Sequence, residues 1–104
     1  MKKLYVIRHS KSSWKDFRLE DFHRPLNSRG KTDGQIMSSY LLSKIDKIDF
    51  LHCSSSVRTH ETSKFFIDKI KFIEIKYDES LYHSSSSVII NNIKCYLEKY
   101  NSAL

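Results

Sequence analysis

Short apolar runs alternate with helical patterns along this chain, and this alternation constrains the fold more than any other feature of the sequence. The apolar runs, which predict strands, are residues 4–7 (LYVI), residues 49–53 (DFLHC) and residues 72–77 (FIEIKY). Apolar residues at helical spacing follow each run, in residues 28–45 and after the serine stretches at 54–56 and 84–87. Strands that alternate with helices predict right-handed crossovers and a mainly parallel sheet. We therefore predict an α/β fold of three layers, α/β/α, in a single domain of residues 1–104.

The three predicted strands differ in the burial that their patterns indicate. Residues 4–7 are continuously apolar, which is typical of a strand buried on both faces. Residues 72–77 alternate instead, with Ile73, Ile75 and Tyr77 on one face and polar residues between them, which predicts a half-solvated strand near a sheet edge. The helix of residues 28–45 has a capping residue at its start, either Asn27 or Ser28.

Charge and composition restrict the classes of partner. The net charge of +6 favours anionic partners, but the lysines are spread along the chain without a block of like charges. Aromatic residues do not interleave with basic ones as they do in RNA-binding strands, so we expect no nucleic-acid partner. No apolar run approaches the ~18 residues of a membrane span, and the N-terminus has too few apolar residues for a signal peptide. These features predict a cytoplasmic protein that does not bind membranes.

The two cysteines, Cys53 and Cys95, have no metal-binding spacing with each other or with histidines. Both lie in patterns that predict reduced core residues. We expect no metal and no cofactor.

Polar clusters follow all three predicted strands. Arg8 and His9 come after the first, Arg58 follows the second in CSSSVR, and His83 follows the third in DESLYH. Because the carboxyl ends of parallel strands meet at one edge of a sheet, which is where such folds bind ligands, we expect these clusters to lie together.

The residue types in these clusters suit a phosphoryl group. Arginine binds two oxygens at once, and Arg58 also lies near a helix start, which favours anions. A neutral imidazole at His9 can attack phosphorus and form a phosphohistidine, and arginines can supply the positive charge without a metal. The residues alone leave alternatives open: a core His9, a surface Arg8, and an Arg58 that faces water.

The motifs resemble the histidine phosphatase superfamily, which includes the cofactor-dependent phosphoglycerate mutases. RHS after a strand resembles the R-H-G opening of that superfamily, HRPLNSRG (23–30) resembles its R-P-L-x-x-x-G segment, and CSSSVRTHET (53–62) resembles its S-S-x-x-x-R-x-x-x-T helix entry. RHSKSSW and SLYHSS resemble the SixA-type phosphohistidine phosphatases most. The resemblance covers residues 4 to about 87 and implies a phosphoglycerate mutase-like fold.

The resemblance also implies roles for individual residues. His9 would be the phosphoacceptor, and Arg8 and Arg58 would clamp the phosphoryl oxygens. Ser10 stands where the family has a glycine and would contact the substrate.

Arg24, in the R-P-L segment, would add a basic residue at the pocket mouth. The alternative for Arg24 is a loop salt bridge to Asp16 or Asp21.

The family has a second catalytic histidine on a strand inserted between the first two strands seen here. The chain ends where that strand would begin, so we expect a C-terminally truncated domain in which His83 stands near the substrate. Without the inserted strand, residues 4–7 and 49–53 would pair directly, leave a gap, or recruit a strand from another chain and so self-associate through exposed edges. Asp78 or Glu79 is the candidate general acid.

Two functions follow. The first is a phosphatase that removes a phosphoryl group from a phosphorylated protein, at phosphohistidine, or from a small phosphate ester, through a phosphohistidine intermediate. The alternative is a catalytically degenerate module that binds phosphate or a phosphoprotein without turnover.

Overall fold

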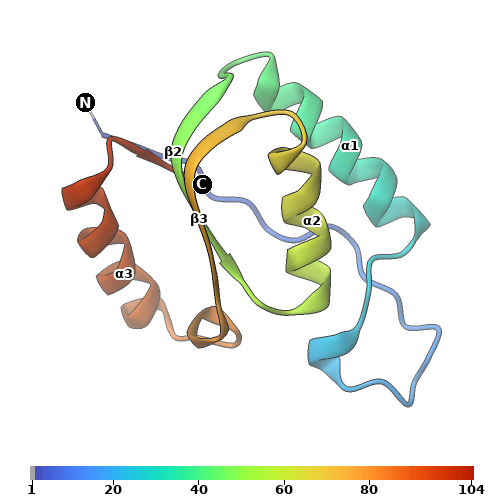
Figure 1. Cartoon of the computed structure of the whole chain (residues 1–104). Coiled ribbons are helices and arrows are strands. Elements are labelled where there is room, and N and C mark those ends of the chain that lie inside the picture. Colours follow the sequence, from blue (N-terminus) through green and yellow to red (C-terminus); the bar gives the residue numbers. More distant parts are fainter. Residues whose placement is uncertain (1) are drawn as a thin grey trace.

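The computed structural model describes residues 2–104 and shows a four-stranded parallel sheet between helices. The sheet order is β1-β4-β2-β3. The strands are β1 (Lys3–Leu4), β2 (Lys47–Ser54), β3 (Lys71–Asp78) and β4 (Ser102–Ala103). The α-helices are α1 (Ser28–Leu42), α2 (Val57–Ile67) and α3 (Ser86–Lys99), with short 3-10 helices η1 (Asp21–His23) and η2 (Glu79–Leu81). Helices α1 and α2 lie on one side of the sheet and α3 on the other, which confirms the predicted three-layer α/β fold (Figure 1).

The hydrophobic core lies between β2 and the α1–α2 layer. Ile48, Phe66 and Ile70 form its fully buried centre, with half-buried side chains from both termini and from β3 around them. Phe66 comes from α2, whereas Ile70 lies just beyond the last residue of that helix. Gly34 lets α1 approach α2, because a Cβ at this position would meet the Phe65 ring at 2.4 Å.

The first strand is shorter and more exposed than the sequence predicts. Strand β1 covers only Lys3–Leu4, and the next residues of the apolar run are open, with Val6 80% exposed. A buried strand in a parallel sheet needs paired strands at its edges and helices over its faces. Here the neighbouring strand, β4, contributes two residues, Ser102 and Ala103, so the expectation of a buried strand at 4–7 is wrong.

Strand β4 lies between β1 and β2, where the family resemblance implied an inserted strand. Ala103 is fully buried, and the Leu104 backbone exchanges hydrogen bonds with Phe50 and His52 of β2. Strands β1 and β2 are therefore not paired with each other. Beyond the two residues of β4, residues 5–9 and the end of β2 line a cavity instead of pairing, which corresponds to the gap among the three expected outcomes.

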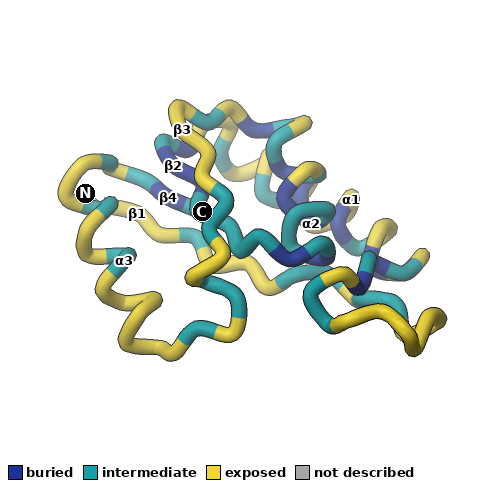
Figure 2. Tube along the Cα trace, turned by 60° about the horizontal axis from the view of Figure 1, so that its bottom comes forward, coloured by how far each residue is buried: buried dark blue, intermediate teal, exposed yellow. Residues whose placement is uncertain are grey.

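Strand β3 is an outer strand of the sheet, as its alternating pattern predicts. Phe72 packs against the core, whereas Ile73 is 63% exposed and Ile75 is exposed as well. Much of β3 is coloured as exposed in Figure 2. Ile73 and Ile75 are therefore open to solvent on this outer strand.

Helix α3 is held to the sheet mainly through aromatic rings. Its cap is Ser85, whose side chain accepts from the Val88 N–H. Phe50 stacks on Tyr100 at 5.0 Å between ring centroids and lies 5.1 Å from Tyr96. None of the residues of α3 is buried, and Cys95 itself is exposed, so the expectation that it is a core residue is wrong.

Helix α1 anchors the segment that follows His9. The Asn27 side chain caps the helix by accepting from the Gly30 N–H, as the sequence predicts. Gly30 itself permits close packing on this segment, because a Cβ there would lie 2.1 Å from the Lys11 carbonyl oxygen. The Asn27 N–H also donates to that carbonyl. The helix ends at Leu42 rather than at the predicted residue 45.

None of the helices in residues 2–104 is long and apolar enough to cross a membrane.

Candidate functional site

His9 presents one ring nitrogen for chemistry. Its Nδ1 lies 2.7 Å from the carbonyl oxygen of Ser10. A carbonyl oxygen only accepts, so Nδ1 carries the proton, and in the neutral imidazole the lone pair is on Nε2. The half-buried His9 side chain is therefore held in the tautomer that a nucleophilic Nε2 requires.

The segment that carries His9 is attached to α2. The Ser10 N–H donates to Thr62 Oγ1 at 3.1 Å, and this hydroxyl donates to the Arg58 carbonyl oxygen at 2.7 Å. Thr62 is buried, which protects both hydrogen bonds from water. The predicted site residue Ser10 thus has a structural function through its backbone, while its side chain is half-exposed.

Arg58 lies in the first turn of α2 and is 8% exposed, so the open alternative of an arginine that faces water is not what the structure shows. Its two terminal nitrogens donate to one residue. Nη1 lies 2.6 Å from the Asp21 carbonyl oxygen and Nη2 lies 2.8 Å from Asp21 Oδ2. Arg8, in contrast, is exposed and forms no side-chain hydrogen bond or ion pair within residues 2–104.

Arg24 is buried and engaged in its own loop. It donates to Asp21 Oδ1 at 2.9 Å, to the Ser13 carbonyl oxygen and to Ser12 Oγ. The Trp14 ring covers its guanidinium at 3.1 Å. The salt bridge to Asp21, which was the alternative for Arg24, is therefore present.

Asp21 is the centre of this arrangement, and the sequence indicated it only as one of two partners for Arg24. Besides both arginines, Tyr82 donates its hydroxyl proton to Asp21 Oδ2 at 2.6 Å. The Tyr82 hydrogen bond, and then Arg58 and Arg24, hold the pKa of the Asp21 carboxyl far below its ordinary value. The same carboxylate raises the pKa of Tyr82. Asp21 is thus ionised and Tyr82 neutral at physiological pH.

His83 joins the same group. Its Nε2 lies 3.2 Å from Asp21 Oδ2, and its backbone φ of 52° places it in the left-handed region. The side chain is 68% exposed. The polar clusters were expected to lie together at one edge of the sheet. Two of them do so, because Arg58, which follows β2, and His83, which follows β3, both contact Asp21 of η1.

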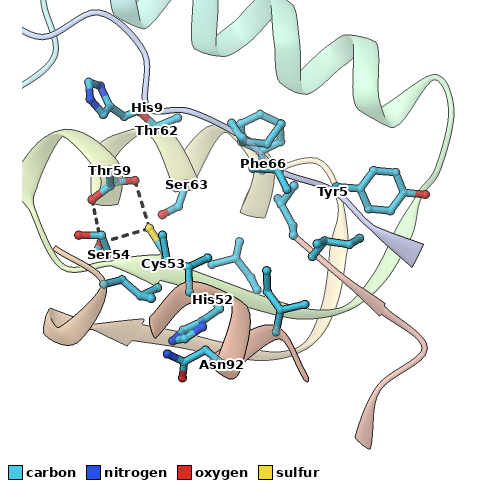
Figure 3. Close-up of a pocket in the computed structure, with 18 of the residues that line it drawn as sticks. Tyr5, His9, His52, Cys53, Ser54, Thr59, Thr62, Ser63, Phe66 and Asn92 are labelled. Carbon is cyan, nitrogen blue, oxygen red and sulfur yellow. Dashed lines mark hydrogen bonds between the residues drawn. The ribbon is translucent and has the colours of Figure 1, made fainter. Parts of the chain in front are cut away.

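A cavity of about 230 Å³ begins beside His9 and runs between residues 5–9, the end of β2 and α3 (Figure 3). Most of its lining is apolar, and Leu104 lies at its border. Cys53 lines it as well, but burial raises the pKa of this thiol to about 11. Cys53 therefore stays a protonated, unreactive thiol, which donates hydrogen bonds to the carbonyl oxygens of Ser54 and Thr59.

Of the two candidate general acids, Asp78 is poorly suited to the role. Hydrogen bonds from Ser80, and then from His52, lower its pKa to about 2. An acid that is ionised at neutral pH cannot give a proton to a leaving group. Glu79 lies in η2 and is exposed.

No three side chains of His, Cys, Asp or Glu come together as a metal-binding group in the part of the chain that the structure describes.

Three solved structures have this arrangement of strands and helices. A candidate phosphohistidine phosphatase SixA from Agrobacterium tumefaciens superposes with a TM-score of 0.89 over 96% of this chain, at 24% identity. A candidate SixA from Nakamurella multipartitia gives 0.82 over 97%, at 20% identity. The protein histidine phosphatase SixA complexed with tungstate gives 0.85 over 97%, at 17% identity. The chain has the fold of the SixA phosphohistidine phosphatases.

Comparison with sequences gives one partial match. A chloroplastic Arabidopsis thaliana protein of uncharacterised function is 35% identical over 63 residues, which are 61% of this chain and 29% of that protein. No protein-family model matches the chain. The chain spans 64%, 55% and 65% of the lengths of the three SixA structures.

Proposed function

We propose that this chain is a phosphatase that acts through a covalent phosphohistidine at His9. The observation that carries the proposal is the hydrogen bond from His9 Nδ1 to the Ser10 carbonyl oxygen, which leaves the Nε2 lone pair available. The SixA-type fold supports a hydrolase of the histidine phosphatase family.

The reaction has two steps. The Nε2 lone pair forms a bond to phosphorus while the bond to the leaving group breaks, and the leaving group takes a proton from solvent. A water molecule then attacks phosphorus, gives up a proton to solvent, and releases inorganic phosphate as the N–P bond returns its electron pair to Nε2. Arg58, with Arg8 on the same strand-end turn as His9, stabilises the negative charge of the phosphoryl oxygens.

The proposed substrate is a phosphorylated protein that carries phosphohistidine, or a small phosphate ester. A phosphoramidate nitrogen is easily protonated, so it leaves without a strong general acid. This matches a site in which Asp78 is ionised. The cytoplasmic location stays a prediction.

The alternative is a phosphate-binding module without turnover. This alternative is favoured by the two hydrogen bonds from Arg58 to Asp21. They occupy one edge of the guanidinium, which is then not available to bind phosphoryl oxygens.

Labelling with a phosphodonor tests the first proposal against the alternative. Wild-type protein should acquire an acid-labile, base-stable label and should hydrolyse a generic aryl phosphate, and His9→Ala should do neither. His60→Ala is a matched control, because this α2 histidine packs against the Tyr77 ring of β3 and has no proposed role. If the His9→Ala protein still acquired the label, His9 would not be the phosphoacceptor. If the wild-type protein bound phosphate or tungstate without turnover, the binding module would be favoured.

We also propose that the chain self-associates through exposed strand edges. The support is the open edge of β3, with Ile73 largely exposed, and the open residues after β1, with Val6 80% exposed.

A further inference from the structure

Asp21 receives more side-chain donors than any other carboxylate in the described chain, and these donors come from distant segments. Arg24 belongs to its own loop, Arg58 comes from α2, and Tyr82 and His83 follow η2. The sequence separation to His83 is 62 residues. One carboxylate thus connects the loop after His9, the start of α2 and the end of β3.

The contact with Arg58 uses only part of its guanidinium. Arginine has five N–H donors in a planar fork. Asp21 takes one from Nη1 with its carbonyl oxygen and one from Nη2 with Oδ2. Nε–H and the second hydrogens of Nη1 and Nη2 form no other hydrogen bond within residues 2–104. Asp21 therefore holds one edge of the fork and leaves another edge with donors for two oxygens.

Arg58 is held from both ends. Its carbonyl oxygen accepts from Thr62, whose hydroxyl also receives the Ser10 N–H of the His9 turn. Its guanidinium is tied to Asp21, which Arg24 and Tyr82 hold in place. Because a long side chain loses rotamer freedom when it is fixed, a prior anchor reduces the cost of ordering Arg58 around a ligand.

We propose that Asp21 is a positioning residue that acts through Arg58: it fixes the guanidinium so that its free edge meets the phosphoryl oxygens. Asp21 itself does not touch the substrate. This inference rests on the proposed phosphatase function and identifies what orients the clamp.

The change Asp21→Asn separates orientation from charge. Removing a negative charge would by itself strengthen the attraction for an anion. Loss of orientation has the opposite effect, because one amide oxygen cannot serve Arg24, Arg58 and Tyr82 together. We expect kcat/KM for an aryl phosphate to fall about 10-fold to 150-fold, the range for losing a hydrogen bond to a charged group.

Two controls isolate the path through Arg58. Asp16→Asn changes an exposed aspartate of the same loop, which pairs with Arg18, and it should leave turnover and melting temperature unchanged. In an Arg58→Gln background, Asp21→Asn should lower turnover less than about 3-fold, because groups that act through one contact are non-additive. A merely structural role would give an equal loss in both backgrounds.

A readout without turnover tests the same inference. In wild-type protein, the ¹⁵N-attached Nη protons of Arg58 should show restricted rotation, and Asp21→Asn should average them. Averaged Nη signals in the wild type, unchanged turnover in Asp21→Asn, or equal losses in both backgrounds would each overturn the proposal. If wild type neither turns over an aryl phosphate nor binds tungstate, the proposed function fails, and the Nη signals still decide whether Asp21 orients Arg58.

Discussion

The backbone N–H of Ser10 donates to the hydroxyl of Thr62 at 3.1 Å, which fastens the turn after His9 to the middle of α2. The hydroxyl can do this because its own proton goes to the Arg58 carbonyl oxygen one helical turn earlier. The placement of the candidate nucleophile thus depends on one buried threonine.

Thr62→Val should destabilise the protein and slow the proposed reaction. Valine keeps the shape but leaves the Ser10 N–H without its acceptor, which costs about 1–3 kcal/mol for a buried donor. Chemical denaturation and aryl phosphate turnover measure the two effects. Thr62→Ser keeps the hydroxyl and should retain most activity, and the control Thr32→Val removes an exposed hydroxyl of α1. Wild-type turnover in Thr62→Val would show that this bond does not position His9.

Arg58→Lys should weaken the site despite its unchanged charge. A lysine has one nitrogen and cannot reach both Asp21 oxygens while presenting an edge to a phosphoryl group. We expect a loss of about 10-fold to 150-fold in kcat/KM, with a parallel loss of tungstate affinity. Arg18→Lys is the matched control, because Arg18 forms an exposed pair with Asp16. Retained turnover and affinity in Arg58→Lys would contradict the clamp.

Substrates with good leaving groups should react faster than poor ones. Asp78 is ionised and cannot protonate a sugar alkoxide, so a phosphoramidate or an aryl phosphate should exceed a sugar phosphate in kcat/KM. Comparing the three substrates on wild-type protein checks this. Equal values would indicate a working general acid, and Glu79→Gln would then be the variant that should lose sugar phosphate turnover.

Asp78 should contribute stability that acid removes. Its pKa is lowered in the folded protein from 3.8 to about 2, so the unfolded chain binds its proton first as the pH falls. The contribution is complete above the unfolded pKa and is lost as the pH falls from about 4 to about 2. Asp78→Asn should therefore make the melting temperature less dependent on pH across this window. Asp33→Asn, in an exposed pair with Arg29, is the control, and an equal effect of both changes would argue against the Ser80 and His52 contacts.

Self-association should depend on the open edge of β3. Ile73→Lys adds a charge to this outer strand, which disfavours edge pairing, and should lower the mass seen by light scattering at high protein concentration. Ile36→Lys, on the exposed side of α1, should leave the mass unchanged. A wild-type chain that is monomeric across the concentration range would contradict the proposal.

Local features of the sequence were sufficient for much of the fold. The alternation of apolar runs and helical patterns predicted the layers and the parallel sheet, because these periods depend on neighbouring residues alone. Asn27 was recognisable as a helix cap for the same reason. The burial of residues 4–7 could not be predicted in this way, since it depends on how many residues β4 places beside them.

The candidate site also has residues that local sequence predicted and contacts that depend on tertiary structure. His9, Arg58 and His83 could be named because each follows a predicted strand, and parallel pairing accounts for the edge at which the clusters of Arg58 and His83 meet. Two findings were decided only by tertiary structure: Arg58 donates to Asp21, and Tyr82 completes the group. Asp21 lies at the start of the short 3-10 helix η1, 37 residues from Arg58 and 61 from Tyr82. No local period or spacing connects such positions. A carboxylate that serves several distant donors becomes visible only when the chain brings them within hydrogen-bond distance.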